Sequence, residues 1–259
     1  MKKEWFRKGN VLKAIFVLSV FMYGLSYPFL TFLLTVFLTA YLCCLMWRKG
    51  RITVYKNSNI VAGILVVISA GVACLCGIDH GVAFVGLLRI ICAVVYVLIL
   101  IQHTGEEVKE ALDALPTIAL IMLLICLVFY PFPFLRALVV NNSRLGGFFQ
   151  YSNTLALYLL LAVSILLFQM QGEEPKTRVG NNGKLISLLM GIFWSGSRLT
   201  FLMLLCVCIY FFICYKSLRV TLGTVMSMLI FGAIVYVGAT GDTMSIGRFT
   251  TISLNESTL

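Results

Sequence analysis

The chain has 259 residues, of which 61% are hydrophobic and 12% are charged, and its formal net charge is +10. This composition lies outside that of soluble domains, and apolar runs close to the length of a membrane span recur along the chain. The basic residues stand in short clusters between those runs and form no basic face, so the charge does not indicate a nucleic-acid partner. We therefore expect an all-α, multi-pass membrane protein.

Nine apolar segments are candidate transmembrane helices, the seventh being short. The first two form a hairpin broken before Pro28, because proline disfavours a helical conformation in the preceding residue and suits a first helical turn. We expect one domain over residues 1–259, with residues 241–259 starting an extracytoplasmic loop. In chain order the expected helices are Val11–Tyr27, Pro28–Trp47, Asn59–Gly77, Val82–Ile101, Pro116–Tyr130, Asn153–Phe168, Leu185–Trp194, Leu199–Tyr215 and Val220–Thr240.

The distribution of lysine and arginine predicts the orientation of these helices. With the amino terminus in the cytoplasm, 15 of the 20 basic residues fall on the cytoplasmic side, in agreement with the positive-inside rule. All four basic residues outside are arginines, whose planar fork binds phosphate or carboxylate oxygens in a bidentate way. They are Arg136, Arg144, Arg198 and Arg248.

Neither the histidines nor the cysteines form a recognisable metal site. The segment Gln102–Asp113 is expected to be an amphipathic cytoplasmic connector, in which His103 is a solvated loop residue. His80 follows Asp79 in an outer turn, where a turn role is favoured over that of a general base. The nine cysteines fall within or at the ends of apolar runs without metal-ligand spacing, so we read them as small buried thiols and predict no metal and no cofactor.

The outer face carries the strongest candidate for a site. The helices beginning at Asn153 and near Leu199 both start outside, so their unpaired N–H groups face the outer surface. Arg144 and Arg198 lie near these two starts, and two helix starts with two arginines can bind an anion. Asn153 is predicted to cap one helix, and Ser195 or Ser197 the other.

Two glycines and one buried arginine complete this prediction. Gly146 and Gly147 would let the chain turn sharply and bring its backbone close to a ligand. Arg89 lies roughly 10 to 12 Å inside the outer end of its helix, where it lines the same cavity or makes a structural ion pair or hydrogen bond. Each of these residues also has a simpler explanation. The glycines and Asn153 can be ordinary loop residues, and the arginines can extend to the lipid headgroups.

At these residues the sequence resembles the O-antigen ligase and O-antigen polymerase family of bacterial membrane glycosyltransferases. The matching pieces are Arg144-Leu145-Gly146-Gly147-Phe148-Phe149, then Ser152-Asn153-Thr154-Leu155-Ala156, the Ser197-Arg198 pair that opens a helix, and Arg248 after the ninth helix. They cover about thirty residues, and the order of the helices between them also agrees.

The resemblance implies glycan transfer on the outer face of the cytoplasmic membrane of a bacterium. The donor would be a glycan on undecaprenyl pyrophosphate, and the acceptor a hydroxyl of another glycan or lipid. Arg144 and Arg198 would contact the pyrophosphate, with Arg248 and Arg89 as weaker candidates, because fixed arginines and helix starts stabilise the charge of a pyrophosphate leaving group. Family members also carry a histidine in a long outer loop that would activate the acceptor. No such histidine follows Arg248 here, so the chain is expected to be truncated before that loop.

Two other readings stay open. A transporter for an anionic solute would also combine many helices, a buried arginine and helix starts that face an anion, although we find no inverted repeat. A non-catalytic subunit or inactive fragment is the third reading.

Overall fold

The computed structural model describes residues 8–21, 27–51, 58–141, 144–171, 178–223 and 227. Almost all of these residues are helical, which agrees with the predicted all-α class. Four helical segments are long and apolar enough to cross a membrane, and a bent pair at Arg198–Cys214 and Lys216–Gly223 would make a fifth span. The four are Pro28–Lys49, His80–Gln102, Gly105–Phe129 and Ser152–Met170. The chain is thus a helical membrane protein, while the count of nine spans and their orientation stay predictions.

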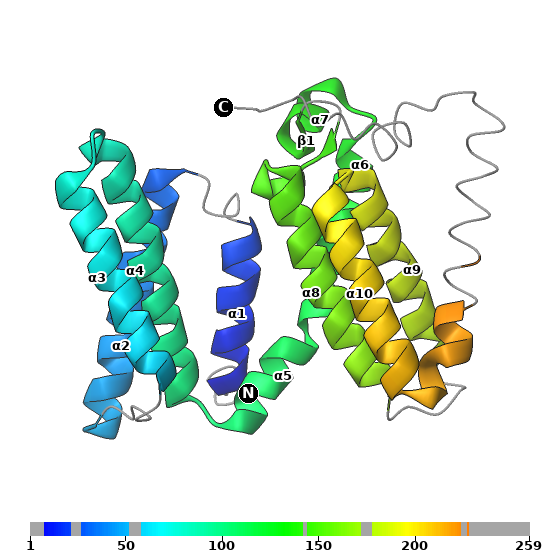
Figure 1. The fold of residues 1–259 in the computed structure, drawn as a ribbon, viewed down its shortest axis with the longest axis horizontal. Helices are drawn as coiled ribbons and strands as arrows, with labels where there is room; N and C mark the ends of the chain where they lie inside the picture. Colours follow the sequence, from blue (N-terminus) through cyan, green and yellow to red (C-terminus); the bar gives the residue numbers. More distant parts are fainter. Residues whose placement is uncertain are drawn as a thin grey trace, which may run out of the picture. The chain divides into compact units, whose positions relative to one another are not determined.

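The chain divides into two compact units, residues 1–114 and 115–259. The first unit contains α1 to α5, drawn in blue to green in Figure 1. In it, α4 packs against both α2 and α3, and α5 packs against α1. Its core includes Leu12, Leu38 and Ile99, all fully buried. The helices are α1 (Lys8–Phe21), α2 (Pro28–Lys49), α3 (Ser58–Cys76), α4 (His80–Gln102) and α5 (Gly105–Asp113).

The ends of α2 follow from local sequence. Pro28 occupies the first turn, as predicted, because a helix start needs no N–H there. Gly50 ends the helix in the left-handed conformation with φ of 64°, and its N–H donates to the carbonyl of Met46. The helix therefore runs two residues beyond the predicted end at Trp47.

The predicted connector between the fourth and fifth helices is the amphipathic helix α5. Thr104 and Glu107 form a capping box at its start, in which each side chain accepts from the other residue's backbone N–H. The prediction for His103, just before this helix, was wrong. Its side chain is 1% exposed, and both ring nitrogens have partners.

The second unit contains the remaining helices and one short hairpin. Its centre is the packing of α8 against α6 and α9. At this centre, a Cβ atom on Gly191 of α9 would come within 2.8 Å of Leu123 on α6 and 2.9 Å of Leu159 on α8. The elements are α6 (Leu115–Phe129), α7 (Pro133–Val139), β1 (Val140–Asn141), β2 (Arg144–Leu145), the 3₁₀ turn η2 (Gly147–Phe149), α8 (Ser152–Met170), α9 (Arg178–Ser195), α10 (Arg198–Cys214) and η3 (Lys216–Leu218).

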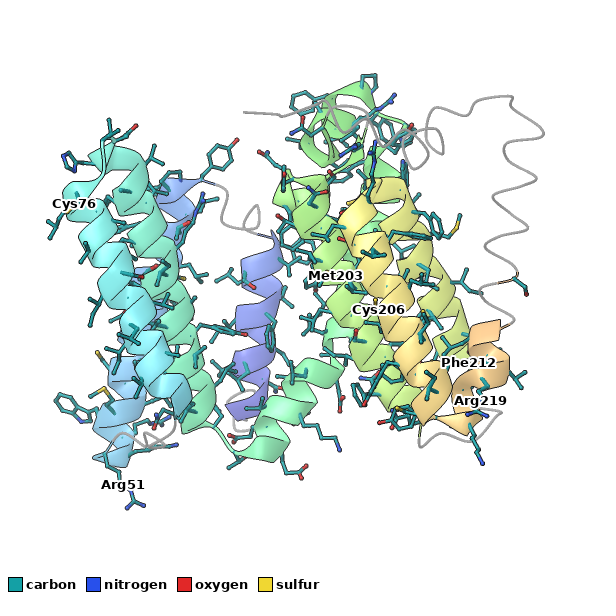
Figure 2. The ribbon with its side chains drawn as sticks, in the orientation of Figure 1. Arg51, Cys76, Met203, Cys206, Phe212 and Arg219 are labelled. Carbon is teal, nitrogen blue, oxygen red and sulfur yellow. The ribbon has the colours of Figure 1, made fainter. Side chains whose placement is uncertain are left out.

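The chain bends by 117° after α10. Arg219 holds this bend, because its Nε and Nη2 atoms donate to the carbonyls of Phe212 and Ile213 at 2.8 and 3.2 Å. Its guanidinium also lies over the Phe212 ring, and Figure 2 shows the two side chains together at this end of the helix. Of the ninth predicted helix, Val220–Thr240, only residues 220–223 and 227 are among those described, and residues 241–259 lie outside them.

Candidate functional site

A short hairpin at one end of the second unit carries Arg144. Asn141 pairs with Arg144 and Val140 with Leu145 in an antiparallel register. Residues directly opposite in such a pair place their side chains on the same face. Arg144 and Asn141 are therefore side-chain neighbours.

The two glycines after the hairpin form a tight turn. Gly147 has φ of +54°, a conformation that L side chains rarely adopt. A Cβ atom on Gly146 would lie 3.1 Å from the carbonyl carbon of Gln150, so the chain packs closely on itself here. The predicted sharp turn is present, and the close approach that it permits is to the chain's own backbone.

Arg144 packs against the turn between α9 and α10. Its Nε atom lies 3.7 Å from the position that a Cβ atom on Gly196 would occupy. Gly196 has φ of +65° and joins Ser195, the last residue of α9, to Ser197 at the start of α10. The structure thus brings Arg144 to the Ser195–Arg198 segment, which is more than fifty residues away in sequence.

The capping predictions for the two helix starts were wrong. Asn153 is the second residue of α8, and its Nδ2 atom donates to the hydroxyl of Tyr151 at 3.2 Å. Tyr151 is the residue at the N-cap position, and among the described residues its side chain caps nothing. Asn153 cannot cap because the helix has already begun before it.

At α10 a serine occupies the N-cap position, as predicted, but its hydroxyl does not make the predicted capping bond. Ser197 stands at the N-cap position, yet its hydroxyl shares a hydrogen bond of 2.9 Å with Thr200 and makes no capping bond within the described part of the chain. The hydroxyl of Ser195 accepts from the N–H of Ser197 at 3.4 Å. At both helix starts, then, the residue at the N-cap position makes no side-chain capping bond within the described part of the chain, which suits an external anion.

The arginines of this end have no acidic counterpart in the described unit. The sequence has no aspartate or glutamate from residue 115 to 171 or from residue 178 to 241. The described part of the second unit therefore holds no carboxylate side chain, although Arg136, Arg144 and Arg198 all lie in it. The positive charge at this end suits a negatively charged ligand.

Arg136 and its aromatic neighbours belong to the same end of the unit, and the sequence prediction did not place them in the site. The Arg136 guanidinium lies 4.6 Å from the centre of the Tyr130 ring, a cation–π contact. The Tyr130 and Trp194 rings pack in a T-shaped arrangement with their centroids 5.0 Å apart, and Trp194 directly precedes Ser195. Nothing in the spacing of these residues indicates that they meet.

Of the other predicted arginines, Arg198 lies at this end of the second unit, whereas the described residues do not place Arg89 or Arg248 there. Arg89 lies on α4 of the first unit, where its side chain is exposed. Arg198 opens α10 with an exposed side chain two residues from Gly196. Arg248 lies outside the described residues. Roles for Arg89 and Arg248 stay predictions.

The histidines and cysteines do not supply a metal site within the described ranges, where no group of three histidine, cysteine, aspartate or glutamate side chains could hold an ion. Asp79 caps α4 by accepting from the N–H groups of Gly81 and Val82. His80 is the first residue of α4, not a turn residue as predicted, and its Nδ1 atom donates to the Cys74 carbonyl at 3.0 Å. Five cysteines are less buried than predicted, because Cys43, Cys44, Cys76, Cys206 and Cys214 are exposed.

No known protein family, curated protein or solved structure matches the chain. Its function must therefore be inferred from the arrangement of its own residues.

Proposed function

We propose that the end of the second unit that carries Arg144 binds an anionic ligand, and that the chain takes part in transferring a glycan from a pyrophosphate-linked lipid donor. The observation that carries the proposal is the contact between Arg144 and the Gly196 turn, which sets a guanidinium beside the uncapped start of α10. A fixed cation beside the backbone N–H groups of a helix start is a suitable arrangement for phosphate oxygens.

Charge supports an anionic ligand at this end. Arg136, Arg144 and Arg198 lie in a unit whose described residues include no carboxylate side chain, so within that described part an anionic ligand would not compete with an acidic side chain. In a membrane protein such cations are retained where they meet lipid phosphates, water or a charged ligand. A pyrophosphate group offers several oxygens to more than one arginine at a time.

The chemistry of glycan transfer fits this arrangement. The bond between the sugar and the pyrophosphate breaks while an acceptor hydroxyl attacks the sugar carbon, and negative charge develops on the departing pyrophosphate. Arg144, Arg198 and the N–H groups at the start of α10 would stabilise that charge without a metal. The resemblance of Arg144–Phe149, Ser152–Ala156 and Ser197–Arg198 to the O-antigen ligase and polymerase family points to the same reaction, in a bacterial cytoplasmic membrane.

A base for the acceptor hydroxyl is not assigned. The sequence contains two histidines, His80 and His103. His103 is buried and bonded at both nitrogens, and His80 binds a backbone carbonyl. The proposal therefore concerns recognition of the donor and stabilisation of the leaving group.

One observation favours a second candidate, a transporter of an anionic solute. The 117° bend between α10 and Lys216–Gly223 is a broken helix, and transporters use broken helices at their binding sites. The ligand class is the same in both proposals, so the decisive difference is movement of a solute across the membrane.

Replacing Arg144 or Arg198 by alanine tests the proposed function. In a strain lacking the gene, we expect undecaprenyl-linked glycans to accumulate and surface polysaccharide to change, and the wild-type gene to reverse both. The Arg144→Ala and Arg198→Ala variants should restore less than about a hundredth of the wild-type transfer, because each removes a charge contact made in the transition state.

The matched control is Lys216→Ala. Lys216 is an exposed cation of the same unit, and it lies beyond the far end of α10, about 24 Å along that helix from Arg198. The Lys216→Ala variant should restore the glycan pools of the wild type. Full activity of Arg144→Ala at wild-type protein levels would remove Arg144 from the site, whereas unchanged glycans in the deletion strain together with lost solute uptake would favour the transporter.

A further inference from the structure

Gln150 has a backbone conformation that its residue type does not favour. Of the described residues with φ in the left-handed region, three are glycines, Gly50, Gly147 and Gly196, and the fourth is Gln150 with φ of 55°. A side chain in that region is strained, and such strain collects where a side chain is needed for function. Glycine would form this turn without strain, so the shape of the turn alone does not explain why residue 150 is a glutamine.

The surroundings hold Gln150 in this conformation. Its N–H donates to the carbonyl of Gly147 at 3.2 Å, which closes η2. Its own carbonyl accepts from Nδ2 of Asn141 at 3.1 Å. Gly146 packs so closely on Gln150 that a Cβ atom there would lie 3.1 Å from its carbonyl carbon.

Asn141 links the backbone of Gln150 to the hairpin that carries Arg144. Asn141 is the strand partner of Arg144, and the two side chains share a face of the hairpin. Since Asn141 also holds the Gln150 carbonyl, one residue connects the strained turn to the arginine.

The side chain of Gln150 is free to meet a ligand. It is half-buried, and its amide makes no hydrogen bond to any of the described residues. The next residue, Tyr151, is 58% exposed, and its hydroxyl accepts from Asn153. The turn that Asn141 links to the Arg144 hairpin thus carries an uncharged amide and an exposed aromatic ring.

We propose that Gln150 is a specificity-determining residue that hydrogen-bonds the hydroxyl groups of the sugar attached to the anionic part of the donor. This inference rests on the proposed function. A neutral amide can both donate and accept hydrogen bonds, as hydroxyl groups do. It carries no charge, so it binds a phosphate less well than arginine does. Arg144 would bind the pyrophosphate while Gln150 and Tyr151 contact the uncharged sugar.

The Gln150→Gly variant separates a structural role from a binding role. Glycine removes both the side chain and the strain, so the purified variant should unfold at a temperature equal to or above that of the wild type. In the deletion strain it should restore about five- to tenfold less glycan transfer than the wild-type gene, the effect of losing one or two hydrogen bonds. The Gln150→Asn variant keeps an amide and tolerates the left-handed conformation, so it should restore more transfer than Gln150→Gly.

Several outcomes distinguish this inference from the proposed function. If the deletion strain shows unchanged glycans, the proposed function fails. If Arg144→Ala abolishes transfer while Gln150→Gly restores it fully, the proposed function stands and the role of Gln150 is overturned. Equal transfer by Gln150→Gly and Gln150→Asn, or a lower unfolding temperature for Gln150→Gly, would also overturn it, since the glutamine would then serve the fold or make no amide contact.

Discussion

The side chain of His103 joins two helices of the first unit. Its Nδ1–H donates to Oε2 of Glu107 at 3.0 Å, which leaves Nε2 to accept from the hydroxyl of Tyr41 at 3.2 Å. The same Glu107 oxygen accepts from the N–H of Thr104 at 3.1 Å. One carboxylate therefore fixes both the start of α5 and the imidazole, and the imidazole fixes Tyr41 of α2.

Replacing His103 by alanine should therefore destabilise the protein. The substitution leaves the Tyr41 hydroxyl and one Glu107 bond without a partner at a site that is almost fully buried, which costs about 1–3 kcal/mol. Denaturant unfolding in detergent micelles measures the loss. The control is His80→Ala, which removes an exposed side chain and should change the free energy of unfolding by less than about 0.5 kcal/mol. Similar losses in the two variants would show that the contacts of His103 do not stabilise the fold.

Some residue-level features of the candidate site could be predicted from sequence and others could not. The Gly146–Gly147 turn was predictable because glycine adopts backbone conformations that other residues rarely adopt, as Gly147 does here. The error at Asn153 came from residue type, since asparagine is a good cap but the helix begins one residue earlier at Ser152. The strain at Gln150 was not predictable, because it depends on the Asn141 contact across the hairpin.

At the scale of the elements, α9 shows packing that overrides local propensity. We predicted a short helix from Leu185, because glycines and asparagines precede it. The helix in fact starts at Arg178 and includes Gly180, Asn181, Asn182 and Gly183. These residues are poor helix formers, but α8 packs along α9 and the Nη1 atom of Arg178 donates to the Ser217 carbonyl at 2.8 Å. Tertiary contacts of this kind are absent from a local sequence pattern.

Replacing two glycines of α9 by alanine should change the stability of the protein in opposite directions. At Gly191 the new methyl group would meet Leu123 and Leu159 at less than 3.0 Å, so α6 and α8 must shift, at a cost of about 1–3 kcal/mol. At Gly183 nothing lies within 4 Å, so alanine should stabilise the helix by about 0.5–1 kcal/mol. Thermal unfolding of both purified variants measures the difference. Stabilisation by Gly191→Ala would mean that α6, α8 and α9 pack less closely than described.

At the scale of the whole molecule, hydrophobicity and charge predicted the class of the protein but not the contacts of its site. Runs such as Pro28–Lys49 and Ser152–Met170 can be recognised because a membrane span requires a long apolar segment. The contact between Arg144 and Gly196 depends on how α8, α9 and the hairpin pack together. A list of outer arginines therefore predicts an anion-binding face, but not which arginines share it.

The orientation in the membrane can be tested with two native thiols. Cys76 at the end of α3 and Cys214 at the end of α10 are both exposed, and Figure 2 labels Cys76 at one end of the first unit. The positive-inside rule puts Cys76 outside and Cys214 in the cytoplasm. In variants that keep one of these cysteines and replace the other eight by serine, a membrane-impermeant maleimide added to intact cells should label Cys76 but not Cys214.

The number of transmembrane segments between Cys76 and Cys214 determines how each labelling result is interpreted. The predicted topology has an odd number of spans between them, so the thiols must lie on opposite sides. Labelling of Cys214 but not Cys76 would reverse the orientation and put Arg144 and Arg198 in the cytoplasm, away from an extracytoplasmic donor. Labelling of both would require an even number of crossings. Because α4, the segment Gly105–Phe129 and α8 are all long and apolar enough to span the membrane, α9 or α10, with its 117° bend, would then be the segment that enters without crossing.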